Sequence, residues 1–509
     1  MQADPTLPDK PTGRTREVRG TEGPWPLHNT ARTRTLEQAA QAVSPQPPLM
    51  ARAGLALARL GRALAPHAER TLVLAGPGNN GGDGLVAARL LHNARHSVQV
   101  RLAADPARLP PDAAQALRMA ASAGVDIQPF DAREKLLLGP QDLAIDALLG
   151  IGSRRAPEGA VASAIQTWAG LQAHTLAVDL PSGLHPDTGA MLGQQAVSAQ
   201  ATLALLTIKP GCFTAQGRDH AGQVWWNDLG LPVPEASAWL LGAPAPLSRP
   251  YSGHKGRFGD VWVLGGAGGM EGALVLAAHA ALAAGAGRVF ACPLQPGATP
   301  SIRAEIMLRP VAEALQPGLL AAAVAVVGCG GGSAVAQALP ALLAGAARLV
   351  LDADGLNAVA ASPSLQRALV ARSDRGQSTV LTPHPLEAAR LLGCSSSDVQ
   401  GDRLAAAHAL ARRFQAILVL KGSGSVVAAP DGTVFVNPTG NAALGTAGTG
   451  DVLAGWLGGL WAQAPDDAPR AAHAAVWTHG EAADRWRATG HAGPLRAADL
   501  VEAMAMASA

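Results

Sequence analysis

Short apolar runs separated by helix-length amphipathic segments recur along most of the chain. In the first half they are TLVLAG (71–76), SVQVRLAA (97–104), DLAIDALLG (142–150), HTLAVDLPSG (174–183) and ATLALLTIKPG (201–211). Strands spaced by helices are typical of a parallel sheet that helices cover on both faces. The pattern therefore predicts an α/β fold.

The same alternation resumes after a proline-rich stretch, GLPVPEASAWLLGAPAPLSRP. The later runs are GDVWVLGG (259–266), AGRVFACP (286–293), AAVAVVGCGGG (322–332), ARLVLDADGL (347–356), STVLTPHP (378–385) and AILVLKGSGSVVAAPDGTVFV (416–436). A chain of 509 residues is too long for one core, and prolines often mark a boundary. We expect two tandem α/β domains, at 27–240 and 241–509.

The segment before the first run has two parts. Residues 35–64 predict a helix, a proline break and a second helix, whereas residues 1–26 are polar and rich in proline. Because residues 1–26 have neither the apolar core of a secretory signal nor the acid-poor composition of a transit peptide, we expect a disordered tail on a cytoplasmic protein.

Composition narrows the functional classes. Apolar residues make up 48% of the chain, charged residues 15%, and the formal net charge is +2, so the chain has no electrostatic feature that favours nucleic acid. The longest apolar stretch, near 319–328, is about half of the roughly 20 residues that a membrane helix needs. We expect no nucleic-acid partner and no membrane span. The cysteines are far apart and predict buried thiols; they are Cys212, Cys292, Cys329 and Cys394.

A glycine-rich loop, LAGPGNNGGDG (74–84), follows the first run. It fits the dinucleotide pattern G-x-G-x-x-G, and Asp105 follows the next strand at about the distance of a ribose-binding acid. Asp83, however, places a negative charge where a pyrophosphate would bind. This aspartate either caps the helix that follows or belongs to a polar site.

The asparagines of this loop favour the polar site. Asn79 and Asn80 offer amide donors and carbonyl oxygens, which suit a polar ligand or a weakly hydrated cation. Asp146 and Asp179 end two other strands, and parallel strands open on one edge of the sheet. Each could also cap a helix. A carboxylate on such a turn can be desolvated, so Asp179 is our candidate for proton transfer.

The second half contains a dense motif, NPTGNAALGTAGTGDVLAGWLGGL (437–460). Residues 448–450 would place bare amides at a helix N-terminus, ready to hold a phosphoryl group. Asp451 could then accept the proton of a substrate hydroxyl. The alternative is glycine for helix packing with an aspartate cap. The loop resembles the anion hole and catalytic base of ribokinase-like small-molecule kinases.

Together these motifs resemble the bifunctional NAD(P)H-hydrate repair enzymes. The epimerase half is represented over about 30–235 by GNNGGDGLVAARLL, DALLGIG, AVDLPSGL and IKPGCFTAQGRDHAGQVW. The dehydratase half is represented over about 250–505 by KGRFGDVWVLGGAGGMEGALVLAAHAALAAGAGRV, GCGGG, LDADGLN, TPHPLEAARLLG and LKGSGSVV. The resemblance implies a Rossmann-like three-layer sandwich followed by a ribokinase-like domain, and a homo-oligomer.

The resemblance also implies site residues. The epimerase half would bind the hydrated nucleotide through Asn79, Asn80, Gly81, Gly82, Asp83, Gly150, Ile151, Gly152, Ser153, Arg154, Arg155, Ala156 and the catalytic Asp179. A potassium ion would be held by Asn80, Asp146 and Ser182. The dehydratase half would bind the hydrate through Ala273, Gly332, His384 and the catalytic Asp451. The nucleotide, ADP with magnesium or alternatively ATP, would be bound by Lys421, Gly422, Ser423, Gly424, Ser425 and Gly450.

Some alternatives stay open at this point. His384, between two prolines, is either presented by a rigid turn or an ordinary surface histidine. Leu386 replaces the usual glycine of the family, and residues 442–444 replace its proline-glycine-methionine. One rival function is a Rossmann oxidoreductase fused to a vitamin-type small-molecule kinase. Another is a nucleotide sensor without turnover.

Overall fold

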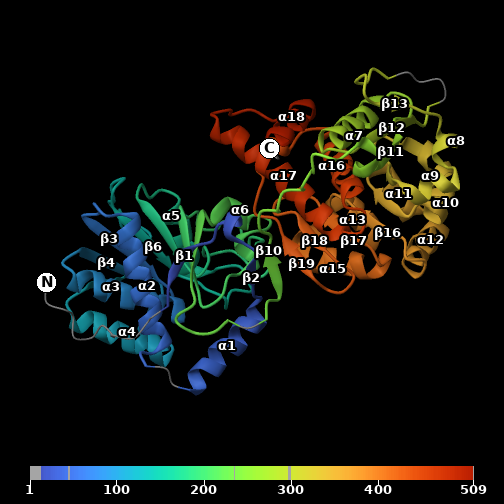
Figure 1. Cartoon of the computed structure of the whole chain (residues 1–509). Helices are drawn as coiled ribbons and strands as arrows, with labels where there is room; N and C mark the ends of the chain where they lie inside the picture. The colour runs from blue at the N-terminus through green and yellow to red at the C-terminus, as the bar shows by residue number, and fades with distance from the viewer. Residues whose placement is uncertain (1–12, 44–45, 234, 296–299, 508–509) are drawn as a thin grey trace. The chain divides into compact units, whose positions relative to one another are not determined.

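The computed structural model describes residues 13–43, 46–233, 235–295 and 300–507 (Figure 1). The chain divides into two compact units, Met1–Leu240 and Leu241–Ala509. Both are α/β, as the alternating pattern predicts. Among the described residues, no helix has the length and apolar character to cross a membrane.

The first unit is built on a sheet with strand order β1-β9-β8-β7-β6-β3-β4-β5. Its central strands are parallel, and only β1 runs antiparallel, on β9. Strand β10 pairs antiparallel with β2, outside this sheet. The strands are β1 Thr15–Glu17, β2 Trp25–Leu27, β3 Arg70–Ala75, β4 Ser97–Leu102, β5 Asp126–Pro129, β6 Leu143–Ala147, β7 His174–Val178, β8 Ala201–Leu205, β9 Gln223–Asn227 and β10 Ala238–Leu240.

Helices cover both faces of this sheet, which gives three layers. Alternate strand residues such as Val73 and Ile145 pack with α2, α3 and α4, whereas Leu72 and Ala144 pack with α5 on the other face. This alternation follows from the two-residue period of a strand. The helices are α1 Thr30–Ala42, α2 Leu49–Leu64, α3 Asn79–Asn93, α4 Pro111–Ser122, α5 Gly159–Trp168 and α6 Gly217–His220.

Residues 13–26 differ from the disordered tail that was expected for residues 1–26. Residues 1–12 lie outside the described part, but Thr15–Glu17 pairs with the edge strand β9. Trp25 packs edge-on against Trp226, with 6.0 Å between ring centroids. The expectation failed because a strand held by backbone hydrogen bonds to an exposed edge needs no apolar run of its own.

The second unit carries the strand order β13-β12-β11-β14-β15-β16-β17-β18-β19. It is parallel from β13 to β17, and the last two strands are antiparallel. The antiparallel end departs from the parallel pattern expected, because the connections after β17 and β18 are too short for a crossover helix. The strands are β11 Asp260–Gly265, β12 Arg288–Pro293, β13 Met307–Leu308, β14 Val324–Val327, β15 Arg348–Leu351, β16 Ser378–Leu381, β17 Ile417–Leu420, β18 Val426–Ala428 and β19 Val434–Val436.

A helical layer packs on one face of this second sheet. Its apolar residues, with Trp456 and Trp461 among the largest buried, form one core with strand valines such as Val261 and Val326. The helices in this layer are α7 Glu271–Ala283, α16 Thr449–Gln463, α17 Ala468–Ala488 and α18 Ala497–Ala507. The remaining helices are α8 Val311–Ala314, α9 Pro317–Ala322, α10 Val335–Gly345, α11 Ala353–Ala361, α12 Pro363–Asp374, α13 Pro385–Leu392, α14 Ser396–Gly401 and α15 Arg403–Phe414.

The cysteines only partly match the expectation of buried thiols. Cys212, Cys292 and Cys329 are buried, but Cys394 is exposed. Cys394 follows α13 on the surface. The sequence around it has no apolar periodicity from which its exposure could be predicted.

Candidate active sites

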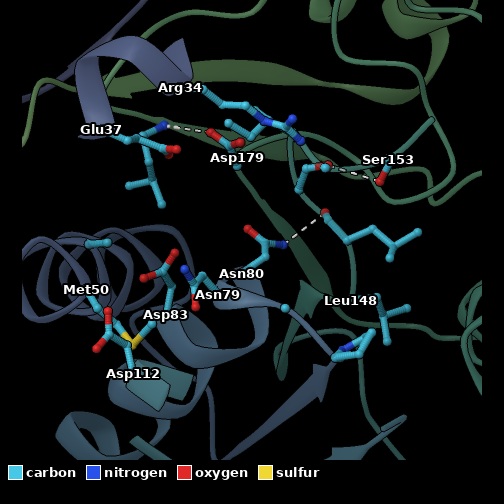
Figure 2. A pocket seen from close by; sticks show the side chains of 18 of the residues that line it. Arg34, Glu37, Met50, Asn79, Asn80, Asp83, Asp112, Leu148, Ser153 and Asp179 are labelled. Atoms are coloured by element: carbon cyan, nitrogen blue, oxygen red, sulfur yellow. Dashed lines mark hydrogen bonds between the residues drawn. The ribbon is translucent and has the colours of Figure 1, made fainter. Parts of the chain in front are cut away.

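A cavity of about 940 Å³ lies at the carboxyl edge of the first sheet (Figure 2). This is where ligands bind in open α/β sheets. It brings together the loops after β3 and β6, the end of β7 and the helix α1. Of the residues expected to bind the hydrate, those that line it are Asn79, Asn80, Asp83, Gly150, Ile151, Gly152, Ser153, Arg154, Arg155, Ala156 and Asp179.

The glycines of the β3–α3 loop are required by packing. A Cβ on Gly76 would lie 1.8 Å from the carbonyl oxygen of Leu148, and one on Gly81 would lie 2.2 Å from that of Gly76. Gly81 and Gly82 are buried in α3 and do not line the cavity. The glycines thus let β3, α3 and the β6 end approach closely and place the asparagines at the rim.

Asp83 is not the helix cap that one interpretation expected. The N-cap of α3 is Gly78, and Asp83 lies a full turn further along the helix, facing the cavity. Burial raises the pKa of Asp83 well above its usual value, and the charges of Asp179 and Glu37 raise it further. Asp105, the candidate ribose-binding acid of the dinucleotide interpretation, instead caps the short 3-10 helix Pro106–Arg108 and is exposed.

Asp179 adopts a backbone conformation that is uncommon for an aspartate. Its φ of 71° lies in the left-handed region, and such strain clusters at functional sites. The carboxylate accepts a 3.2 Å hydrogen bond from the amide of Leu205 and forms an ion pair with Lys209. Lys209 is 1% exposed and also donates to the carbonyl oxygens of Leu205 and Thr207, at 2.7 and 2.9 Å. Asp179 therefore does not cap a helix.

The residues expected to hold potassium form one hydrogen-bonded group beside the cavity. Asp146 accepts from the Ser182 hydroxyl at 2.7 Å and from the Ser182 amide at 2.8 Å. Asn80 donates to the carbonyl oxygen of Leu149 at 2.9 Å, and the Leu149 amide donates to Ser182 Oγ at 2.9 Å. The structure thus brings all three side chains together around Leu149, in the loop between β6 and α5.

Asp146 is fully buried, and burial raises its pKa to about 6. Hydrogen bonds from Ser182 and Leu148 oppose the shift, but no cationic side chain among the described residues contributes to it. The Asp146 carboxylate, the Ser182 hydroxyl and the Leu149 carbonyl oxygen lie together, and oxygen ligands of this kind are those that a hard cation prefers. The residues present therefore fit a potassium ion.

In the second unit, α16 begins at the GTGD motif. Its N-cap Gly448 has a φ of 88°, and a Cβ there would lie 2.6 Å from Leu276. Asp451 lies in the first turn, so the helix N-terminus and a carboxylate share one place. Burial raises the pKa of Asp451 to about 6, and the charge of Asp352 contributes, while a hydrogen bond from the Cys329 thiol opposes the shift.

Lys421 and Asp352 connect the nucleotide loop to this helix. Lys421 Nζ donates to Asp352 Oδ1 at 2.6 Å, and Thr382 donates to the same oxygen at 2.8 Å. A Cβ on Gly450 would lie 3.2 Å from Lys421 Nζ. Asp352 was not among the residues expected at this site. It lies directly after β15, and a carboxylate at the end of a strand was the pattern that had indicated Asp146.

The expected nucleotide loop, residues 421–425, lies on a buried arginine that the sequence did not reveal. Arg403 is 1% exposed and donates to the carbonyl oxygens of Leu420, Lys421 and Gly424 at 3.2–3.4 Å. A Cβ on Gly422, whose φ is 133°, would lie 2.9 Å from the Arg403 guanidinium. The loop therefore has a fixed backbone next to Lys421.

His384 has a structural role that neither interpretation of the TPHP turn foresaw. It is the N-cap of α13, where Nδ1 accepts from the amide of Leu386 at 3.1 Å and Glu387 completes a capping box. Burial lowers the pKa of His384, and the charge of Lys421 adds to this. Burial raises the pKa of Glu387 to about 7. The Leu386 side chain is 46% exposed.

The other two expected contacts of the hydrate lie at the carboxyl ends of β11 and β14. The Gly332 amide donates to Asp354 at 2.8 Å, and Gly332 has a φ of 53°. Ala273 lies in α7, and a Cβ on Gly330 would lie 2.9 Å from the Cβ of Ala273. The structure therefore places both beside the GCGGG turn.

Cys329, Asp352 and Asp451 form a compact cluster, with potential ligand atoms within 4.8 Å of one another. Magnesium prefers oxygen ligands in an octahedral arrangement. Burial raises the pKa of the Cys329 thiol well above its usual value, so the sulfur is protonated. The trio is a poor cage for magnesium.

The fold and the two sites define a two-domain α/β enzyme with a separate centre in each half. Residues 261–505 match the family model described as NAD(P)H-hydrate dehydratase, and residues 46–211 match the model of the YjeF-related protein N-terminus.

Several known proteins are similar to the chain over most of its length. It is 36% identical to the bifunctional NAD(P)H-hydrate repair enzyme Nnr of Escherichia coli, over 86% of this chain and 84% of the relative. It is 38% identical to the Nnr of Coxiella burnetii, over 89% of this chain and 93% of the relative. The chain belongs to the family of bifunctional NAD(P)H-hydrate repair enzymes.

Solved structures match the second half of the chain, and we describe one of them. It is the ADP/ATP-dependent NAD(P)H-hydrate dehydratase of Bacillus subtilis, co-crystallised with ATP/Mg2+. The identity is 31%, the TM-score is 0.43, and the match covers 52% of this chain and 93% of that one.

Proposed function

We propose that this protein repairs hydrated NADH and NADPH in two steps. The N-terminal half interconverts the R and S hydrates, and the C-terminal half dehydrates the S hydrate to NAD(P)H at the expense of ADP, or alternatively ATP. The observation that carries the proposal is the match of both halves to this family, at 36–38% identity over most of the chain. A desolvated carboxyl in each half, Asp83 and Asp451, agrees with proton-transfer chemistry at both centres.

Dehydration needs a better leaving group than hydroxide, and phosphorylation provides one. Asp451 accepts the proton of the hydroxyl, whose oxygen attacks the terminal phosphoryl of ADP and releases AMP. The amides of residues 448–450 hold the transferring phosphoryl group. Lys421 lies beside Gly450, where its ammonium pairs with the charge of the phosphoryl group. The ring nitrogen then expels phosphate, and loss of a ring proton restores the double bond. Magnesium bound to the nucleotide phosphates would offset their charge.

We assign the hydrate of the epimerase half to the cavity that contains Asp179. Asn79 and Asn80 stand at its rim to orient a polar ring, and Asp179 is the proton-transferring group. We further propose that Asn80, Asp146 and Ser182 hold a potassium ion, which would neutralise the Asp146 carboxylate, since no cationic side chain of the described residues acts on it. The homo-oligomer and the cytoplasmic location stay predictions.

The test is an assay on separated R and S hydrates, with ADP and ATP in parallel, that follows the absorbance of the reduced nicotinamide ring. We expect absorbance to return from both epimers, and Asp451→Asn to abolish the return. A protein that reduces or oxidises intact NAD, or phosphorylates a vitamin without restoring absorbance, would support the rival oxidoreductase and kinase instead.

A further inference from the structure

The carboxyl groups of Glu37, Asp83 and Asp179 line the N-terminal cavity, and the buried ammonium of Lys209 pairs with Asp179. Figure 2 shows the carboxyl groups of Glu37, Asp83 and Asp179 turned toward the same hollow. They come from three elements, α1, α3 and the end of β7. Only Asp179 has an ion-pair partner, which is Lys209, among the described residues. Glu37 lies outside the segment 46–211 that matches the family model.

The surroundings of Glu37 are those of a proton-exchanging group. Burial raises the pKa of Glu37; the charge of Lys209 opposes this shift, and that of Asp179 adds to it. Glu37 in turn raises the pKa of Asp83. Arg34 on the same helix acts against the shift of Glu37. The other charged side chains that line the cavity are Asp112, Arg154, Arg155 and Glu158.

These couplings set a charge balance. The ion pair of Asp179 with Lys209 is neutral in sum. Glu37 and Asp83 have no ion-pair partner among the described residues, and burial favours the protonated form of each. The cavity then offers one ion-paired carboxylate and two carboxyl groups that can donate a proton.

Epimerisation of a hydroxyl-bearing carbon needs such an arrangement. The hydroxyl leaves from one face with a proton from an acid, the C–O bond breaks, and the electron pair of the adjacent ring nitrogen forms a C=N bond. Water then adds to the other face and gives a proton to a base, while the C=N pair returns to nitrogen. The atoms balance without any oxidant or reductant, and the reverse reaction exchanges the roles of acid and base.

We propose that Glu37 is a second catalytic residue of the epimerase centre, a proton donor that works with Asp83 in the same cavity, while Asp179, which Lys209 holds in place, is the proton acceptor. This rests on the proposed function of the N-terminal half. Glu37 and Asp83 protonate the hydroxyl that leaves from one face of the ring. Asp179 takes the proton of the water that enters from the other face.

The test follows the conversion of the R hydrate to the S hydrate by chromatography of the two epimers, without ADP, so that the dehydratase half is idle. Glu37→Gln keeps the shape of the side chain and removes its proton exchange. We expect kcat to fall about 100-fold or more, with KM within about threefold of wild type. Glu37→Asp keeps a carboxyl group and should retain part of kcat. Glu69→Gln, at an exposed glutamate directly before β3, is the matched control and should leave kcat unchanged.

The pH profile tests the charge coupling between Glu37 and Asp83, whereas the kcat retained by Glu37→Asp and lost by Glu37→Gln tests the need for a carboxyl group. Asp83 must be protonated to act as the acid, so the rate falls above its raised pKa. Glu37→Gln removes a charge that raises this pKa, and the alkaline limb should therefore move to lower pH. A limb that stays in place would show that the charge of Glu37 does not act on Asp83. Thermal unfolding of each variant checks that it is folded, and if Glu37→Gln does not fold, the same limb is measured for Glu37→Asp.

The outcomes distinguish the two levels of the proposal. If the wild-type protein does not interconvert the epimers, the proposed function of this half fails. If the wild type does and folded Glu37→Gln equals it in kcat and in the alkaline limb, only the role of Glu37 is overturned. Dehydration of the S hydrate with ADP should be the same in all variants, since the second half is unchanged.

Discussion

Lys421 donates a 2.6 Å hydrogen bond to Asp352, whose side chain is 1% exposed. The pair joins the nucleotide loop after β17 to the end of β15, next to the first turn of α16. A buried carboxylate that loses its partner leaves an uncompensated charge, so this contact serves both stability and the site.

Lys421→Met should therefore impair both. We expect the free energy of unfolding to fall by about 3 kcal/mol, because Asp352 would remain buried without its ammonium. The KM for ADP in dehydration of the S hydrate should rise, while epimerisation stays at the wild-type rate. Urea unfolding and the two assays measure these changes. Lys255→Met, at an exposed lysine in a short 3-10 helix, is the control. Wild-type ADP kinetics in Lys421→Met would remove Lys421 from the site.

The pKa of Asp451 gives the dehydratase a pH dependence. Burial raises this pKa to about 6, and the base must be ionised to accept a proton. The kcat/KM for the S hydrate should thus be constant above about pH 7 and fall tenfold per pH unit well below pH 6. Asp451→Asn should lose activity at every pH. The profile is measured with saturating ADP, and a rate that stays constant down to pH 5 would contradict the assignment of Asp451 as the base.

The proposed potassium site predicts a specific stabilisation by the ion. Potassium should raise the midpoint of thermal unfolding of the wild type relative to sodium at equal ionic strength, because only the native chain joins Asp146, Ser182 and Asn80. Asp146→Asn should abolish the difference between the two ions. Calorimetry in matched potassium and sodium buffers measures it. Equal midpoints of the wild type in both buffers would count against the ion.

The glycine loop allows a test with a matched pair of substitutions. Gly76→Ala would place a Cβ 1.8 Å from the Leu148 carbonyl oxygen, and we expect a loss of about 2–3 kcal/mol of stability with loss of epimerisation. A Cβ on Gly78 meets nothing within 4 Å, so the stability of Gly78→Ala should stay within about 1 kcal/mol of wild type. Denaturant unfolding of the two variants decides it. Equal losses would show that loop flexibility matters and close packing does not.

The elements were predictable where the pattern was strong. The runs 71–76 and 142–150 became β3 and β6 because an apolar run between helices is buried on both faces of a parallel sheet. The strand at Thr15–Glu17 was missed, because backbone pairing at an edge leaves no apolar signature. The sequence left open whether Asp83 caps a helix. It does not show that the glycine turn starts α3 earlier in the chain, at Asn79.

The sequence by itself determined the two-domain α/β order, the family resemblance and the positions of Asp179 and Asp451, since these depend on local period and on motif spacing. The tertiary structure decided what surrounds them. Lys209 reaches Asp179 from 30 residues away, and Glu37 enters the same cavity from a helix that precedes the glycine loop. Charge coupling depends on distances in space, which a linear pattern does not contain. Only the folded chain shows that the carboxyl groups of Glu37, Asp83 and Asp179 line one cavity.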